Sequence, residues 1–161
     1  MTVSDARSAV RIERTYNATP ERVWELWTTS AGIESWWAPD GFTVTVDKLD
    51  LRPGGELVYT MTATAPEQIE FMKGAGMPLA TVSRKTFVEV NEPGTLWYNS
   101  LVDFVSDVKP YEFLTEVEIR AVHSGTRVTM SMEAMHDEVW TERLTAGRTN
   151  ELDNLGKLIG D

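Results

Sequence analysis

The sequence predicts an α+β fold in which about six or seven antiparallel strands form one curved sheet, with helices on one face. Segments of alternating apolar and polar residues follow one another along the chain, which is typical of half-buried strands. Short turns separate most of them, and strands joined by such short links must be antiparallel. From Asp137 onward the apolar residues recur at three- and four-residue spacing, which predicts a closing helix.

The composition excludes several classes of protein. The 161 residues fit one domain, residues 1–161, and 42% hydrophobic with 25% charged residues is a globular composition. A net charge of −10 argues against a nucleic-acid binder and against docking to anionic lipid. The absence of cysteine excludes disulfides, thiolate metal sites and cysteine nucleophiles.

No apolar run is long enough to cross a bilayer. Residues 1–9 are polar and lack the layout of a signal peptide, so we expect a cytoplasmic protein.

The first predicted elements are a strand and a helix. Residues 10–16 alternate apolar and polar side chains, which indicates a strand. Thr19 is a good N-cap, Pro20 suits the first helical position and Glu21 suits the positive end of the helix dipole. This helix is expected to end at Gly32.

A second helical turn, a hairpin and a helical excursion follow. Residues 33–37 predict a short turn of helix that Pro39 stops. From Phe42 the period changes to two, residues 52–55 form a turn, and a return strand over 56–63 completes a hairpin. Residues 66–78 then interrupt the strand pattern, with a short helix over 67–73.

Further strands and the closing helix complete the chain. The strands are predicted over 80–90, 95–105, 111–122 and 126–135, separated by turn residues. Asp137 can cap the closing helix. Gly147 is expected to break or kink it, giving a short helix followed by a longer one.

An ordered set of motifs resembles a known superfamily. The motifs are Arg14 in the first strand, Pro20-Glu21-Arg22-Val23-Trp24, Trp36-Trp37 with Pro39, Asp50-x-Arg52-Pro53-Gly54-Gly55, Gly125-Thr126-x-Val128-Thr129 and Leu152-x-x-Leu155-x-x-Leu158. Together they are similar to the START-like SRPBCC superfamily, within it most to the branch related to the activator of the heat-shock-protein-90 ATPase. The resemblance covers about residues 9–160.

The resemblance implies a helix-grip fold (START-like, Bet v-like), in which a seven-stranded sheet curls around a long C-terminal helix. It also implies a cavity for hydrophobic small molecules, although such folds host lipid carriers, cyclases and co-chaperone domains alike. One departure is Gly147-Arg148, where relatives often carry Gly-Trp. A charged residue there changes the packing or the mouth of the cavity.

Aromatic and methionine side chains are the candidate lining of this cavity, because they combine apolar surface with adaptability or a polar atom. The candidates are Trp36, Trp37, Tyr59, Met61, Tyr98, Met130, Met132 and Trp140. Simple packing in the core is the alternative for each of them.

Arg84 is a candidate for orienting a polar group of the ligand. It shares one parity of its strand with Val82, Val88 and Val90, so an inward face would bring its guanidinium into apolar space. A buried charge there needs a carboxylate or an anionic ligand group. Alternatively, the strand is bulged, or Arg84 lies in water at the open end.

His136 follows the last strand and is a second candidate for orienting a ligand. It shares a strand face with Met130 and Met132, which would point it toward the cavity rim. As a general base it would need a partner and a substrate proton within reach. The alternative is a partly solvated histidine at a strand end. His136-Asp137-Glu138 lacks the spacing of a metal site.

We therefore expect a binding protein for a small hydrophobic or amphipathic molecule, monomeric or homodimeric, with no cofactor or metal. Two alternatives stay open. One is a protein-interaction domain with a chaperone-type partner, which an exposed apolar patch on a sheet edge or on residues 66–78 would favour. The other is a cyclase- or hydratase-type enzyme, which needs an inward titratable group with a perturbed pKa. No serine or cysteine nucleophile motif is present.

Overall fold

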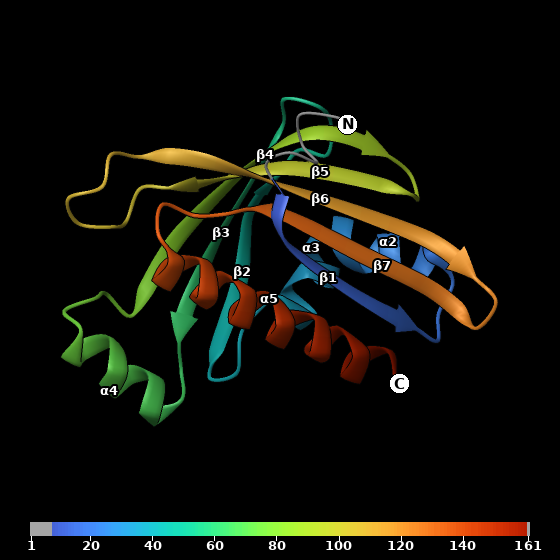
Figure 1. Ribbon diagram of the computed structural model, residues 1–161. Coiled ribbons are helices and arrows are strands. Elements are labelled where there is room, and N and C mark those ends of the chain that lie inside the picture. Colours follow the sequence, from blue (N-terminus) through green and yellow to red (C-terminus); the bar gives the residue numbers. More distant parts are fainter. Residues whose placement is uncertain (1–7, 161) are drawn as a thin grey trace.

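The computed structural model describes residues 8–160. Seven strands form one antiparallel sheet in the order β1-β7-β6-β5-β4-β3-β2. The sheet curls over the long helix α5 (Figure 1). The helices α2 and α3 lie beside α5, and α4 projects away from the sheet (Figure 1). The strands are β1 Ser8–Tyr16, β2 Phe42–Leu49, β3 Glu56–Ala63, β4 Ala80–Asn91, β5 Thr95–Val102, β6 Tyr111–Val122 and β7 Gly125–Glu133. The helices are α2 Pro20–Thr28, α3 Ser30–Trp36, α4 Pro66–Gly74 and α5 Glu138–Ile159. The predicted α+β helix-grip fold is confirmed.

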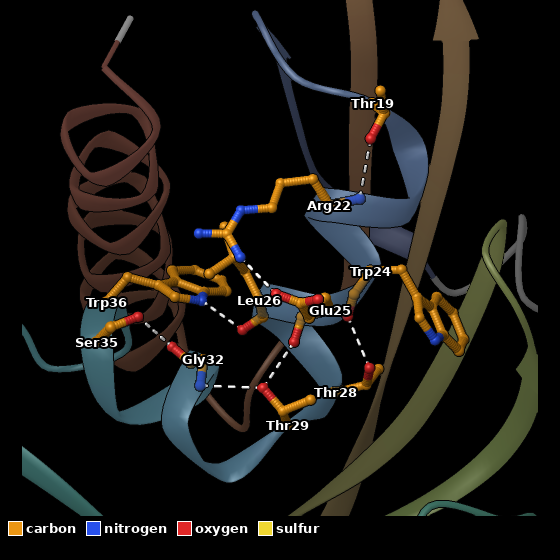
Figure 2. A network of polar contacts seen from close by, with 10 residues as sticks. All are labelled: Thr19, Arg22, Trp24, Glu25, Leu26, Thr28, Thr29, Gly32, Ser35 and Trp36. Carbon is orange, nitrogen blue, oxygen red and sulfur yellow. Dashed lines mark hydrogen bonds and ion pairs between the residues drawn. The ribbon is translucent and has the colours of Figure 1, made fainter.

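A polar network lies where α2 ends and α3 begins (Figure 2). It shows that the first helix ends earlier than predicted. That helix ends at Thr28 and not at Gly32, because Thr29 leaves the helical conformation and caps α3. The Thr29 hydroxyl accepts a hydrogen bond from the Gly32 N–H at 3.0 Å and donates one to the Glu25 carbonyl at 2.9 Å. The Trp36 indole N–H then donates to the Leu26 carbonyl at 2.8 Å and fixes the two helices together.

Strand ladders decide the remaining boundaries. The hairpin of β2 and β3 is confirmed, and the excursion forms α4. Two strands are shorter than predicted. β5 ends at Val102, which is the last residue paired with β6, and β7 ends at Glu133, the last residue paired with β1.

The closing helix is continuous, so the predicted break at Gly147 is wrong. Asp137 caps it as expected, because its carboxylate accepts a hydrogen bond from the Trp140 N–H at 2.8 Å. A glycine inside a helix costs only about 1 kcal/mol, which flanking turns can offset. Gly160, with φ of 96°, ends the helix in the left-handed conformation.

The core fills only one end of the space under α5. The buried residues of this helix, Glu151, Leu152 and Leu155, all belong to its C-terminal half. There the Tyr16 hydroxyl donates to the Leu152 carbonyl at 2.8 Å. Within the described residues, the N-terminal half of α5 has no buried residue, so the sheet and helix leave a space at that end. Among residues 8–160, no helix has the length and apolar character to span a membrane.

Candidate functional site

An open pocket of about 540 Å³ lies between β3, β4 and β5, the helix α4 and the N-terminal half of α5. Its size is within the range of about 300–1,000 Å³ that is usual for small-molecule sites. Most of the wall is apolar. The main apolar side chains are Met61, Met72, Phe113, Met135, Trp140 and Leu144.

Lys85 lies at the inner end of this pocket. Its side chain is only 4% exposed, and its Nζ donates a hydrogen bond of 2.8 Å to the Ser100 hydroxyl. Because Lys85 and Ser100 are register partners on β4 and β5, the sheet itself brings them together. Nζ also lies over the rings of Trp37, Tyr59 and Tyr98, at 5.7, 5.7 and 5.4 Å from their centroids. This is the cation–π distance range.

An ion pair on α5 lies next to Lys85. Arg148 and Glu151 pair one turn apart, with side chains 17% and 8% exposed. The Arg148 Nε is buried and has no hydrogen-bond partner. A void of about 10 Å³ between this pair and the tryptophans has room for about one water molecule.

Burial shifts the pKa values of the groups at this inner end. Burial, and then the charge of Arg148, lowers the pKa of Lys85 to about 7, while Glu151 acts in the opposite sense. Burial raises the pKa of Tyr59 to about 12 and also raises the pKa of Tyr98. At neutral pH both phenols are therefore neutral, and Lys85 is close to its own midpoint.

The cation of β4 that faces inward is Lys85 and not Arg84. The interpretation in which Arg84 faces the apolar space is therefore wrong. The register with β5 shifts between Phe87 and Glu89, so Val90 packs on the core while Val82 and Val88 are exposed. Arg84 borders the pocket, but its guanidinium binds the Glu56 carboxylate at 3.0 Å.

His136 does not belong to the pocket lining. Its Nδ1 lies 2.7 Å from the Tyr111 hydroxyl, and its Nε2 lies 3.6 Å from an Asp137 carboxylate oxygen. Its ring lies 5.8 Å from that of Trp140. The structure thus places it in the link between β7 and α5, beside the Asp137 cap of α5.

The other predicted residues fall into three groups. Tyr59, Met61 and Trp140 line the pocket together with Lys85. Trp36, Trp37, Tyr98 and Met130 line the small void beneath it. Met132 is fully buried and lines neither space. That these side chains bind a ligand stays a prediction.

The rim of the pocket carries exposed apolar side chains. Phe71 on α4 is 64% exposed and Phe104 is 56% exposed, with Met77 and Val82 also exposed. All four residues border the pocket. Residues 66–78 therefore supply part of the rim, a role that their sequence did not indicate.

Several solved structures share this architecture. A protein from Chromobacterium violaceum has a TM-score of 0.76 and 20% sequence identity, and the match covers 94% of this chain and 96% of that chain. A protein from Mycobacterium smegmatis has a TM-score of 0.73 and 19% sequence identity, and the match covers 99% of this chain and 94% of that chain. The AHSA1 protein from Silicibacter pomeroyi has a TM-score of 0.73 and 19% sequence identity, and the match covers 93% of this chain and 96% of that chain. Identities this low show the shared fold alone.

A comparison with curated proteins gave no match. The sequence model of one family matches residues 17–160, and its description is "Activator of Hsp90 ATPase homolog 1-like protein". Because this match spans nearly the whole chain, the protein belongs to the family of Activator of Hsp90 ATPase homolog 1-like proteins.

Proposed function

We propose that the protein binds one small amphipathic molecule in the pocket between the sheet and the N-terminal half of α5. The observation that carries this proposal is the pocket of about 540 Å³ with apolar walls and a polar inner end. Pockets of this kind hold small ligands, since apolar walls supply affinity and a few placed polar groups supply orientation.

The side chains around the pocket suit a flexible apolar ligand. Met61, Met72, Met77 and Met135 contribute to the lining, and methionine adapts to irregular shapes. The exposed rim residues Phe71 and Phe104 would lose water contact when such a ligand enters. Burial of this surface stabilises a complex by roughly 25 cal/mol per Å².

A substitution that fills the pocket tests the proposal. Gly147 borders the pocket, and a Cβ added there meets no atom within 4 Å. We expect Gly147→Phe to place a ring in the pocket and abolish binding of decan-1-ol, measured by isothermal titration calorimetry. Ala146→Phe is the matched control, because Ala146 is exposed and does not border the pocket. Binding that survives Gly147→Phe, or no binding by the wild type, would contradict the proposal.

A second candidate function is favoured by the exposed rim. Phe71 and Met77 lie on residues 66–78, where an apolar surface was expected to favour a protein partner. Gly147→Phe tests this alternative, because it should abolish decan-1-ol binding while a partner that docks on the exposed rim residues Phe71 and Met77 still binds. The family description names an activator of a chaperone ATPase, so Hsp90 is the first partner to test.

A further inference from the structure

The inner end of the pocket has one cation more than it has carboxylates. Arg148 is already paired with Glu151. Within residues 8–160, Lys85 has no carboxylate oxygen within salt-bridge distance. A protonated Lys85 therefore carries an uncompensated charge in a buried place, which is costly unless an anion meets it.

Lys85 and Ser100 together present donors that fit a carboxylate. An ammonium has three N–H donors, and Lys85 uses one of them on the Ser100 hydroxyl. Since that hydroxyl accepts from Lys85, its own proton remains available to donate. Both side chains border the pocket, so the two oxygens of a bound carboxylate could accept one hydrogen bond from each.

The two arginines near the mouth are less suited to hold an anion. Arg84 is committed to Glu56 at 3.0 Å and is half exposed. Arg143 is exposed on α5, and its guanidinium carbon lies 4.9 Å from the centroid of the Trp140 ring. Exposed charges are screened by water and salt, whereas a buried pair is screened much less.

We propose, resting on the function proposed above, that the inner end of the pocket is an anion subsite in which Lys85 and Ser100 bind the carboxylate of an amphipathic monocarboxylic acid. The apolar chain of the acid lies along the methionine-rich wall toward Phe71 and Phe104. A singly charged head group matches the single uncompensated cation. An uncharged head would leave Lys85 unpaired.

Binding of the acid is coupled to protonation of Lys85. The charged and titratable groups that face Lys85 are Tyr59 on β3, Tyr98 on β5, and Arg148 and Glu151 on α5. Burial and Arg148 lower the pKa of Lys85 to about 7 in the free protein, and a carboxylate beside it raises that pKa again. Decanoate affinity should therefore fall as the pH rises from about 7 to about 9.

Three probes with the same chain test the subsite: decanoate, decan-1-ol and decylammonium, titrated calorimetrically into the full-length protein at about pH 6.5. We expect decanoate to bind about tenfold more tightly than decan-1-ol, since a charge-assisted hydrogen bond is worth about that much. Decylammonium should bind more weakly than the alcohol. In Lys85→Met the advantage of decanoate over decan-1-ol should disappear, while decan-1-ol itself still binds.

The outcomes separate this inference from the proposed function. If none of the probes binds the wild type, both proposals fail. If decanoate and decan-1-ol bind equally, the pocket binds ligands but the anion subsite is wrong. If Arg143→Met abolishes the preference and Lys85→Met retains it, the carboxylate lies at the mouth, which overturns the inference. Binding of decan-1-ol by Lys85→Met also shows that this variant is folded.

Discussion

Lys85 on β4 and Ser100 on β5 are cross-strand partners whose side chains meet at 2.8 Å, and this contact forms the polar floor of a largely apolar pocket. Burial of the Lys85 ammonium costs stability, which the hydrogen bond to Ser100 offsets only in part. A lysine that is 4% exposed has lost most of its hydration, and its hydrogen-bond partner Ser100 offers a neutral hydroxyl and no charge.

The first prediction concerns Lys85 and pH. Its folded pKa of about 7 lies below the unfolded value near 10.4, so between these pH values the unfolded state binds more protons. Wild-type stability should therefore rise as the pH increases above about 7, and Lys85→Met should lack this rise. At about pH 6 the variant should be more stable by roughly 1–4 kcal/mol, because the buried charge is gone.

Urea denaturation at about pH 6 and about pH 9 measures this difference, which should shrink at the higher pH. A gap between wild type and Lys85→Met that stays constant with pH would show that Lys85 does not titrate in this range. Tyr59 and Tyr98 have raised pKa values, so they lower stability only above about pH 10, outside the range measured.

The second prediction compares two helical glycines. A Cβ at Gly32 would lie 2.7 Å from both the Leu26 carbonyl oxygen and the Thr29 hydroxyl, whereas a Cβ at Gly147 meets no atom within 4 Å. Gly32→Ala should lower the free energy of unfolding by about 1–3 kcal/mol. Gly147→Ala should raise it by about 0.5–1 kcal/mol, because alanine is the better helix former. A Gly32→Ala variant that is as stable as the wild type or more stable, measured by urea denaturation, would refute the geometry at the junction of α2 and α3.

The third prediction concerns the buried ion pair of α5. Glu151→Gln leaves Arg148 without a compensating charge and should cost about 3–5 kcal/mol. Glu25→Gln is the matched control at the same spacing, since its partner Arg22 is exposed and the loss should be at most about 1 kcal/mol. The double variant Arg148→Met, Glu151→Met should recover most of the loss. Thermal unfolding of the variants would measure the ranking, and a Glu151→Gln loss no larger than that of Glu25→Gln would contradict it.

The fourth prediction links a helix cap to the pocket. Asp137 caps α5 and Thr19 caps α2, and replacing either cap with alanine should cost about 1 kcal/mol of stability. Only Asp137→Ala should also weaken decan-1-ol binding, because the N-terminal turns of α5 line the pocket. Amide hydrogen exchange should show faster opening of these turns in Asp137→Ala. Equal decan-1-ol affinity in the two variants would show that the cap of α5 does not influence the pocket, which would contradict the prediction.

Much of the fold could be predicted from turn chemistry. The hairpin of β2 and β3 followed from a change of period and the turn around Gly54, and the structure pairs these strands as expected. The end of α2 could not be predicted, because Thr29 serves as a cap and sequence alone does not show where the backbone leaves the helix.

The inward cation could not be assigned because a single bulge reverses strand parity. The apolar residues Val82, Val88 and Val90 suggested one continuous inner face, yet the register shift after Phe87 leaves only Val90 on the core. Lys85 lies two residues before the buried Phe87 and therefore on the same face of the strand. The sequence does not show that this face is the inner one, because Val82, Val88 and Val90 all have the opposite parity. The cyclase-type alternative stays a prediction, and its inward titratable group would be Lys85, since His136 lies with Tyr111.

The most direct test of the proposed pocket uses the methionines as internal probes. Met61, Met72, Met77 and Met135 border the pocket, whereas Met132 is fully buried outside it. In a ¹³C-methyl methionine NMR titration with decan-1-ol, the signals of the four pocket methionines should shift together and saturate, while that of Met132 stays in place. Unchanged pocket methionines at saturating decan-1-ol, or a shift of Met132 alone, would contradict a ligand site between the sheet and α5.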